Sequence, residues 1–262
     1  MKKYNYIQKA YYSVLQPIKI LEFISDNTTK AILFIALFSF IISMPYAFTL
    51  ASQFNSGIDE AKNVISSEDF PDFNLVNGKL NILSDKPYIY TIEDKVVKII
   101  IDSSSTFTFN DLAGYAIGYL ITPNNIVNSR LGQTPVTLNY SEITDSPIDK
   151  ASLIKFLDSF KPVFSGIIIV GYLLMAIMTT FIKSMLSYLI VSFTKATSKI
   201  LLLPAQSYKL ALYSMAGPLL FVEIIRFLNI SSAYHLAIFV FVNGLIINRI
   251  FIYIKKIMAP SH

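Results

Sequence analysis

Cysteine is absent from this chain of 262 residues. Its absence excludes disulfide bonds, thiolate metal sites and cysteine nucleophiles. Only two histidines are present, His235 and His262, so imidazoles alone do not build a metal site. Phosphate-binding loops, dinucleotide fingerprints and zinc motifs are also missing. These absences predict a protein that is not an enzyme and binds no cofactor.

Charged residues are scarce. They make up 15% of the chain, against 53% hydrophobic residues, whereas soluble domains carry about 25% charged residues. Acidic residues are also confined in position. Fourteen of the seventeen lie between Asp59 and Asp158, and the exceptions are Glu22, Asp26 and Glu223. The chain is therefore divided into one net acidic part and several apolar parts.

Four apolar stretches flank or follow the acidic part, near 31–50, 163–182, 210–228 and 234–254. Each is close to the ~20 residues that cross ~30 Å of hydrocarbon. The segments joining them on one side carry Lys and Arg but almost no acid, which places them inside. The sequence predicts an α-helical integral membrane protein with four spans and both termini in the cytoplasm.

The source and partners follow from composition. Absent cysteine and abundant Asn, Ile and Lys favour a protein of the bacterial cytoplasmic membrane. The net charge of +5 comes from basic residues that flank the spans. We expect these residues to contact the anionic lipid bilayer and not nucleic acid.

The spans divide the chain into four predicted parts. Residues 1–29 form a cytoplasmic or interfacial segment. Residues 30–51 form a first span that is too long and too late for a cleaved signal peptide, and so acts as a signal-anchor. Residues 52–161 form an extracytoplasmic α+β domain of mainly antiparallel strands. Residues 162–262 form a helical membrane domain with the other three spans.

A basic cytoplasmic loop is predicted at 183–209, between the second and third spans. Within it, 184–194 is apolar but too short to cross the bilayer alone. It either extends the second span or lies along the inner surface. A fifth span here would move Lys255 and Lys256 outside, against the positive-inside rule.

The first segment has five apolar residues at helical spacing between Ile7 and Ile18. This pattern fits a helix on the inner membrane surface or one that packs against the bundle. Pro17 is expected to end or bend the helix. Asp26 or Asn27 is expected to cap the first span.

Turn and strand signals recur within 52–161. Asn77-Gly78 between apolar residues predicts a hairpin, and a second turn is predicted at Glu93-Asp94. A polar helix is expected near 56–68, and a helix at 148–160 leads into a second span that starts at Pro162. The remaining elements are strands at 88–92, 96–101, 116–122, 125–129 and 135–140, and a short helix near 107–114.

Three polar residues lie inside the predicted spans. Glu223 and Arg226 are three positions apart on one helical face, and Asn243 lies at a similar depth in the antiparallel fourth span. A carboxylate in a span is costly unless paired. The Glu223, Arg226 and Asn243 cluster is therefore a candidate ion, proton or lipid-headgroup site. The competing interpretation is a neutralising pair that holds helices together.

Asp102 is the candidate residue of the extracytoplasmic domain. It either caps the helix that follows or contacts a ligand. The acid clusters at Glu68-Asp69 and Glu93-Asp94 lack the spacing of calcium loops. Ser103-Ser104-Ser105 lacks a nucleophile elbow and a nearby histidine base.

Short motifs carry a resemblance over nearly the whole chain. They are a Lys- and Tyr-rich start, Asn77-Gly78-Lys79-Leu80, Lys98-Ile99-Ile100-Ile101-Asp102-Ser103, and Tyr208-Lys209-Leu210 before Gly217-Pro218. In this layout the chain resembles the bacterial family catalogued as domain of unknown function 1189, and more loosely the Yip-type membrane proteins. Some family members are labelled maltodextrin-utilisation membrane proteins. The resemblance implies a role near carbohydrate uptake and implies no catalytic residues.

Two functions compete. The first is a non-enzymatic accessory, scaffold or sensor that displays residues 52–161 to an envelope partner or ligand. Its expected partners are a membrane or envelope protein or a second copy. The alternative is a small oligomeric transporter or lipid-handling protein that uses Glu223, Arg226 and Asn243.

Overall fold

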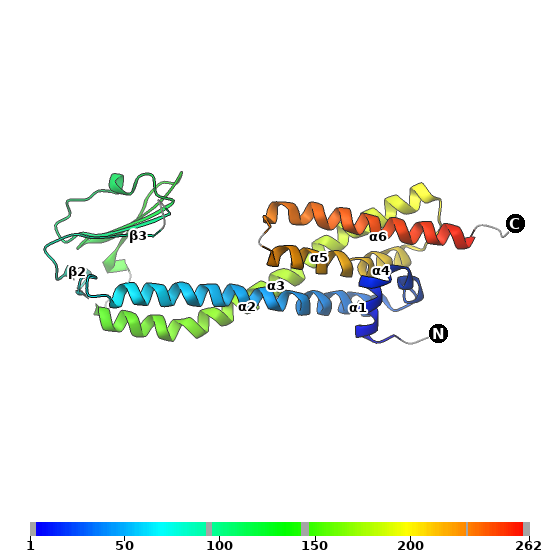
Figure 1. Ribbon diagram of the computed structural model, residues 1–262, viewed down its shortest axis with the longest axis horizontal. Coiled ribbons are helices and arrows are strands. Elements are labelled where there is room, and N and C mark those ends of the chain that lie inside the picture. Colours follow the sequence, from blue (N-terminus) through cyan, green and yellow to red (C-terminus); the bar gives the residue numbers. More distant parts are fainter. Residues whose placement is uncertain (1–3, 93–95, 143–146, 229, 259–262) are drawn as a thin grey trace. The chain divides into compact units, whose positions relative to one another are not determined.

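The computed structural model describes residues 4–92, 96–142, 147–228 and 230–258 (Figure 1). The chain forms two compact units. The strand unit is Phe54–Phe164, where the sequence predicts a domain over 52–161. The helical unit comprises the described residues up to Gln53 and from Ser165 onward. The predicted turn at Glu93-Asp94, the start of the 1–29 segment and His262 lie outside the described residues.

The helical elements are, in chain order, α-helices α and 3-10 helices η: α1 (Tyr6–Leu15), η1 (Pro17–Glu22), α2 (Thr28–Ser66), η2 (Phe109–Leu112), η3 (Tyr140–Glu142), α3 (Lys150–Ser198), α4 (Pro204–Ser214), α5 (Ala216–Phe227), η4 (Ser232–Tyr234) and α6 (His235–Met258). The strands are β1 (Phe73–Val76), β2 (Lys79–Ile82), β3 (Tyr88–Ile92), β4 (Val97–Ile101), β5 (Ile117–Ile121), β6 (Asn125–Arg130), β7 (Val136–Asn139) and β8 (Ile148–Asp149).

Within the described chain, four helices are long and apolar enough to cross a membrane. They are Thr28–Ser66, Lys150–Ser198, Pro204–Phe227 and Ser232–Met258. The first two are much longer than the spans predicted from the sequence. α2 joins the predicted first span to the polar helix expected near 56–68 and contains Pro45. The break between two helices near residue 51 was not found, because the helical backbone continues where hydropathy changes.

α3 corrects two further predictions. Pro162 lies inside this helix and does not begin it. Residues 184–194 extend the helix, so most of the loop predicted at 183–209 is helical. The helix ends where Lys199 adopts a left-handed backbone with φ 56°, a common way to stop a helix. Lys195 then donates from Nζ to the carbonyl oxygen of Leu202 at 2.7 Å, which closes the short turn into α4.

The predicted third span at 210–228 consists of α4 and α5, which meet at Met215 just before Gly217 and Pro218. Proline lacks a backbone N–H, so the helix is interrupted here. These helices form the centre of the unit. In their apolar stretch of 18 residues 61% is buried, against 11% in the corresponding stretch of α3. Tyr213 is fully buried and packs against the rings of Phe23 and Phe34.

The N-terminal segment packs against this centre through one face of α1. Asn5 caps the helix by accepting from the backbone N–H of Gln8 at 2.8 Å. α1 ends before Pro17, as predicted, and η1 follows. The opposite face leaves Ile7 and Leu15 exposed. One face therefore packs on the bundle, and the other leaves apolar side chains exposed.

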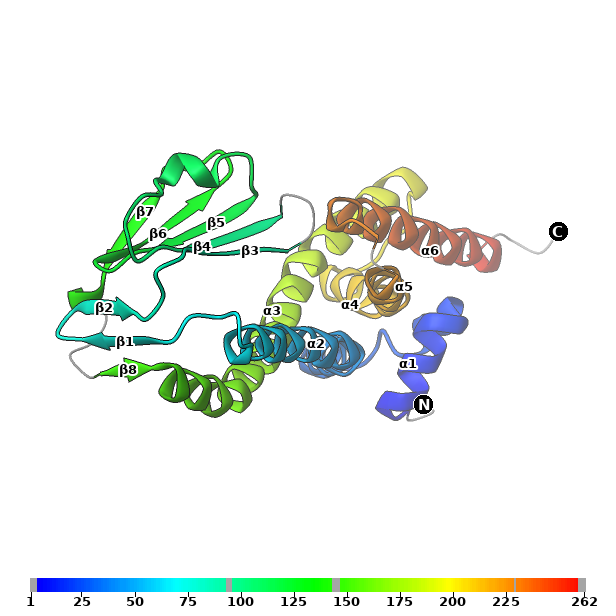
Figure 2. The ribbon, with the colours of Figure 1, turned by 60° about the vertical axis from the view of Figure 1, so that its left-hand side comes forward.

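The strand unit contains two sheets (Figure 2). One has the order β2-β1-β8 and the other β3-β4-β5-β6-β7. The Asn77-Gly78 hairpin is confirmed: both residues have positive φ, 49° and 71°, as a two-residue hairpin turn requires. Buried Tyr140 links the sheets, because it packs with Leu75 and Leu80 and donates its hydroxyl to the carbonyl of Thr122 at 2.9 Å.

One strand pair is parallel. β4 and β5 run in the same direction with Ile99 opposite Tyr119, whereas the other pairs are antiparallel. Parallel neighbours cannot be joined by a tight turn and need a crossover of about a dozen residues or more. The crossover between Ile101 and Ile117 begins at Asp102 and contains η2. The parallel pairing therefore places Asp102 at the start of a long crossover loop.

Candidate functional site

Glu223 and Arg226 form an ion pair on α5, as the sequence predicts. Arg226 Nη1 donates to Glu223 Oε1 at 2.7 Å, and the two side chains are 22% and 13% exposed. Arg226 Nη1 also donates to the hydroxyl of Tyr172 on α3. The guanidinium lies 5.5 Å from the ring centre of Tyr46 on α2 and 5.7 Å from that of Tyr172. The pair therefore joins three helices.

Asn243 has a different set of partners. Its Nδ2 donates to Ser187 Oγ at 2.8 Å, and Ser187 donates to the carbonyl oxygen of Ala211 at 3.0 Å. These bonds join α6, α3 and α4, and Asn243 is fully buried. Among the described residues, Asn243 therefore bonds to Ser187 and not to Glu223 or Arg226.

Two buried oxygens in these sites have no partner among the described residues, Glu223 Oε2 and Asn243 Oδ1. Lys183 on α3 interacts electrostatically with both Glu223 and Arg226 and lies over the ring of Phe239. No pattern in the sequence pointed to Tyr46, Tyr172 or Lys183, because they come from helices whose rotation is set by packing.

A third polar site joins the N-terminal segment to α4. Asp26 Oδ2 accepts from Lys9 Nζ and from the Tyr213 hydroxyl, and the Asp26 carbonyl accepts from Lys209 Nζ at 2.7 Å. Burial raises the pKa of the Asp26 carboxyl, but the hydrogen bonds from Lys9 and Tyr213 outweigh burial and lower it. Asp26 is therefore not the cap of α2. Asn27 is, since its Oδ1 accepts from the Thr29 N–H at 3.0 Å.

Each of the three acids outside residues 59–158 forms an ion pair. Glu22 pairs with Lys19, Asp26 with Lys9, and Glu223 with Arg226. Their isolation in the sequence was the available signal, because a carboxylate near or inside an apolar bundle needs a cation. We interpret these pairs as structural links.

Asp102 lies at the start of the β4–β5 crossover and is 0% exposed. Oδ1 accepts from Ser104 N at 2.9 Å and Ser104 Oγ at 2.7 Å. Oδ2 accepts from Phe107 N at 2.8 Å and Thr106 Oγ1 at 3.1 Å. All four hydrogen bonds to the carboxylate come from its own loop. It does not cap η2, where Asp111 instead accepts from the Thr108 N–H at 2.7 Å.

The loop held by Asp102 forms one wall of a groove of about 530 Å³, here called the crossover groove. The other wall comes from β5, β6 and β7. The lining residues are all uncharged: Ser105, Phe107, Thr108, Phe109, Leu120, Thr122, Asn124, Asn125, Val127, Pro135 and Thr137. The groove thus combines hydroxyl and amide groups with apolar side chains and the exposed ring of Phe109.

The bonds to Asp102 make the strand unit sensitive to acid. Burial raises the pKa of Asp102, but the hydrogen bonds from Ser104, Phe107 and Thr106 outweigh burial and lower it to about 2. Against ~3.9 in the unfolded chain, this contributes about 2.5 kcal/mol of stability. The contribution is complete above pH ~5 and is lost as pH falls through ~4 to ~2, since the unfolded chain then binds the extra proton.

We expect acidification to reduce the free energy of unfolding of the strand unit more in the wild type than in Asp102→Asn. The expected excess is about 2.5 kcal/mol between pH ~5 and ~2. Pulse proteolysis of the full-length protein with pepsin in a urea series measures it. The pKa of Asp149 is lowered by hydrogen bonds from Ser152. Asp149 is present in both proteins, so its contribution cancels in the difference between them. A difference that does not change with pH would contradict the assignment.

Within the described residues, no group of three His, Asp or Glu side chains is placed to hold a metal ion. At the start of α6, His235 Nε2 lies 3.0 Å from the carbonyl oxygen of Ile230, so this ring nitrogen already has a hydrogen-bond partner.

Comparisons with known proteins give one match. A family model described as "Protein of unknown function (DUF1189)" matches residues 7–252. No curated protein and no solved structure matches the chain.

Proposed function

This chain belongs to the DUF1189 family of proteins of unknown function, and from its geometry we propose that it is a membrane-embedded receptor or accessory protein. In this proposal the four apolar helices cross the bacterial cytoplasmic membrane with both termini inside. The strand unit faces outward and binds a ligand in the crossover groove. The protein is not an enzyme, and it acts through a membrane or envelope protein partner or a second copy.

The crossover groove carries the proposal. Its volume, about 530 Å³, is within the ~300–1,000 Å³ of ligand sites. A buried carboxylate fixes one wall by four hydrogen bonds, and a fixed wall reduces the entropy that a ligand must overcome. The acids of the strand unit do not line the groove, although they are numerous.

The lining chemistry favours an uncharged ligand rich in hydroxyl groups. Ser105, Thr108, Asn124 and Thr137 offer both donors and acceptors. Phe109 offers an aromatic face, against which the C–H face of a sugar ring can pack. A neutral oligosaccharide has both features. The resemblance to proteins labelled for maltodextrin utilisation points to the same class.

We expect the purified full-length protein to bind a linear maltodextrin in isothermal titration calorimetry. Phe109→Ala should weaken binding by about tenfold, the effect of losing roughly 1.4 kcal/mol of ring contact. Phe156→Ala is the matched control. Both rings are 53% exposed, but Phe156 does not line the groove. Absence of heat with neutral oligosaccharides, or an equal loss in both variants, would overturn the proposal.

The alternative function, transport or lipid handling by Glu223, Arg226 and Asn243, rests on the two unpartnered buried oxygens. Arg226 also donates to Tyr172, and Asn243 donates to Ser187, so both sites bond to α3. We therefore assign both polar sites to assembly of the helical unit. A Glu223→Gln protein that folds and still binds ligand is expected under this assignment.

A further inference from the structure

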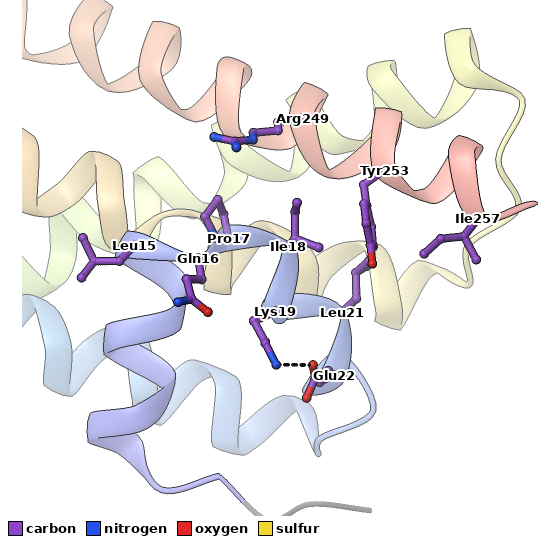
Figure 3. Close-up of a pocket in the computed structure, with 10 residues that line it drawn as sticks. All are labelled: Leu15, Gln16, Pro17, Ile18, Lys19, Leu21, Glu22, Arg249, Tyr253 and Ile257. Carbon is purple, nitrogen blue, oxygen red and sulfur yellow. Dashed lines mark ion pairs between the residues drawn. The ribbon is translucent and has the colours of Figure 1, made fainter.

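A second groove lies in the helical unit, between η1 and the last turns of α6 (Figure 3). Its volume is about 560 Å³. Arg249, Tyr253 and Ile257 line it from α6, at the four-residue spacing that puts side chains on one helical face. Residues 15–19 and 21–22 line it from the end of α1 and from η1. We call this the α6 groove.

The charges in the α6 groove do not balance. Lys19 is neutralised by Glu22, with Nζ 3.1 Å from Oε1, and Figure 3 shows this pair below α6. Glu22 also accepts from the hydroxyl of Tyr4. Arg249 forms no hydrogen bond or ion pair with any residue that the structure describes. The groove therefore has one uncompensated positive charge.

The position of Arg249 along α6 makes this charge unusual. Five apolar or aromatic residues, 250–254, separate it from Lys255 and Lys256. At 1.5 Å per residue Arg249 lies about 9 Å from Lys255 along the helix. In the proposed topology the two lysines mark the inner membrane surface, so Arg249 lies at the level of the inner-leaflet headgroups or just beneath. Basic side chains at this depth are attracted to anionic headgroups.

The other lining residues are those an amphiphile needs. Leu15 and Ile257 are more than 60% exposed and give apolar surface to the two ends of the groove (Figure 3). Gln16 and the Tyr253 hydroxyl add hydrogen-bonding groups to the lining. A soluble anion would leave the apolar residues uncovered, whereas a phospholipid covers them with an acyl chain.

We propose that the α6 groove binds an anionic phospholipid of the inner leaflet. The headgroup phosphate accepts hydrogen bonds from the Arg249 guanidinium, which matches phosphate geometry. An acyl chain lies along Leu15, which Figure 3 shows on the side of Arg249 away from Tyr253 and Ile257. The proposal uses the topology of the proposed function but not its ligand, because the two grooves lie in different units.

Native mass spectrometry of the full-length protein in a neutral detergent tests this. We expect phosphatidylglycerol to bind at least tenfold more tightly than phosphatidylcholine. Arg249→Gln should remove about tenfold of that affinity. Lys255→Gln is the matched control: it removes the same charge from α6, at a residue outside the groove, and should change affinity less than twofold.

Three results would overturn the proposal. Equal losses in Arg249→Gln and Lys255→Gln would mean that the membrane attracts basic residues without a site. Equal binding of phosphatidylcholine would remove the role of charge. Binding of soluble glycerol phosphate as tight as that of the lipid would make this an anion site instead. Phe109→Ala should leave lipid binding intact, so failure of the maltodextrin test and failure of this one are distinguishable.

Discussion

Replacing Arg226 with methionine is expected to destabilise the helical unit by about 3–5 kcal/mol. The variant leaves the Glu223 carboxylate without its cation while Oε2 already has no partner among the described residues. It also removes the hydrogen bond to Tyr172 and the guanidinium beside the Tyr46 ring. Thermal unfolding of the full-length protein in detergent measures the loss.

The partner variants separate pairing from packing. Glu223→Gln retains an oxygen that can accept from Arg226, so we expect a smaller loss, about 1–2 kcal/mol. The double variant Glu223→Met with Arg226→Met should be more stable than Arg226→Met alone, because it removes the carboxylate that Arg226→Met leaves without its guanidinium. Lys256→Met, at an exposed position of the same unit, should change stability by less than about 0.5 kcal/mol. A double variant that loses the sum of both single effects would show that the residues are not coupled.

Replacing Asp102 with alanine is expected to destabilise the strand unit by about 3–4 kcal/mol. The N–H groups of Ser104 and Phe107 lose a charged acceptor at 2.9 and 2.8 Å, and both hydroxyl bonds disappear. That is a large share of the ~5–15 kcal/mol that stabilises a typical domain. Pulse proteolysis at neutral pH measures the change.

Asp85→Ala is the control, because Asp85 is an exposed acid of the same unit. We expect a change below about 0.5 kcal/mol. Hydrogen exchange should localise the effect of Asp102→Ala to residues 103–109, which form a wall of the crossover groove. Maltodextrin binding should weaken as well, although Asp102 does not line the groove. Unchanged exchange in this loop would contradict the role assigned to Asp102.

Local signals in the sequence found most of the elements. Asn77 and Gly78 predicted the hairpin because few residues tolerate positive φ. The strands at 88–92 and 125–129 were found within a residue of β3 and β6. Boundaries set by hydropathy were less successful. α2 and α3 continue past the ends of their apolar stretches, because a helix is propagated by backbone hydrogen bonds and not by hydrophobicity.

The sites depended on contacts that no local pattern encodes. The i,i+3 pair of Glu223 and Arg226 was predictable because both residues are on one helix. The hydrogen-bond partner of Asn243 was not predictable, since Ser187 lies on α3. The parallel pairing of β4 and β5 was likewise invisible, and with it the crossover that Asp102 holds.

The sequence by itself determined the class of this protein. The apolar stretches, the confined acids and the basic flanks specify helices fit for a bilayer and a separate polar unit, because transfer free energy depends on composition. Only the tertiary structure decided which polar groups meet. Helix rotation and strand order bring together residues far apart in the chain, such as Arg226 with Tyr46 and Tyr172. Their energies depend on burial and geometry, which exist only once the chain has folded.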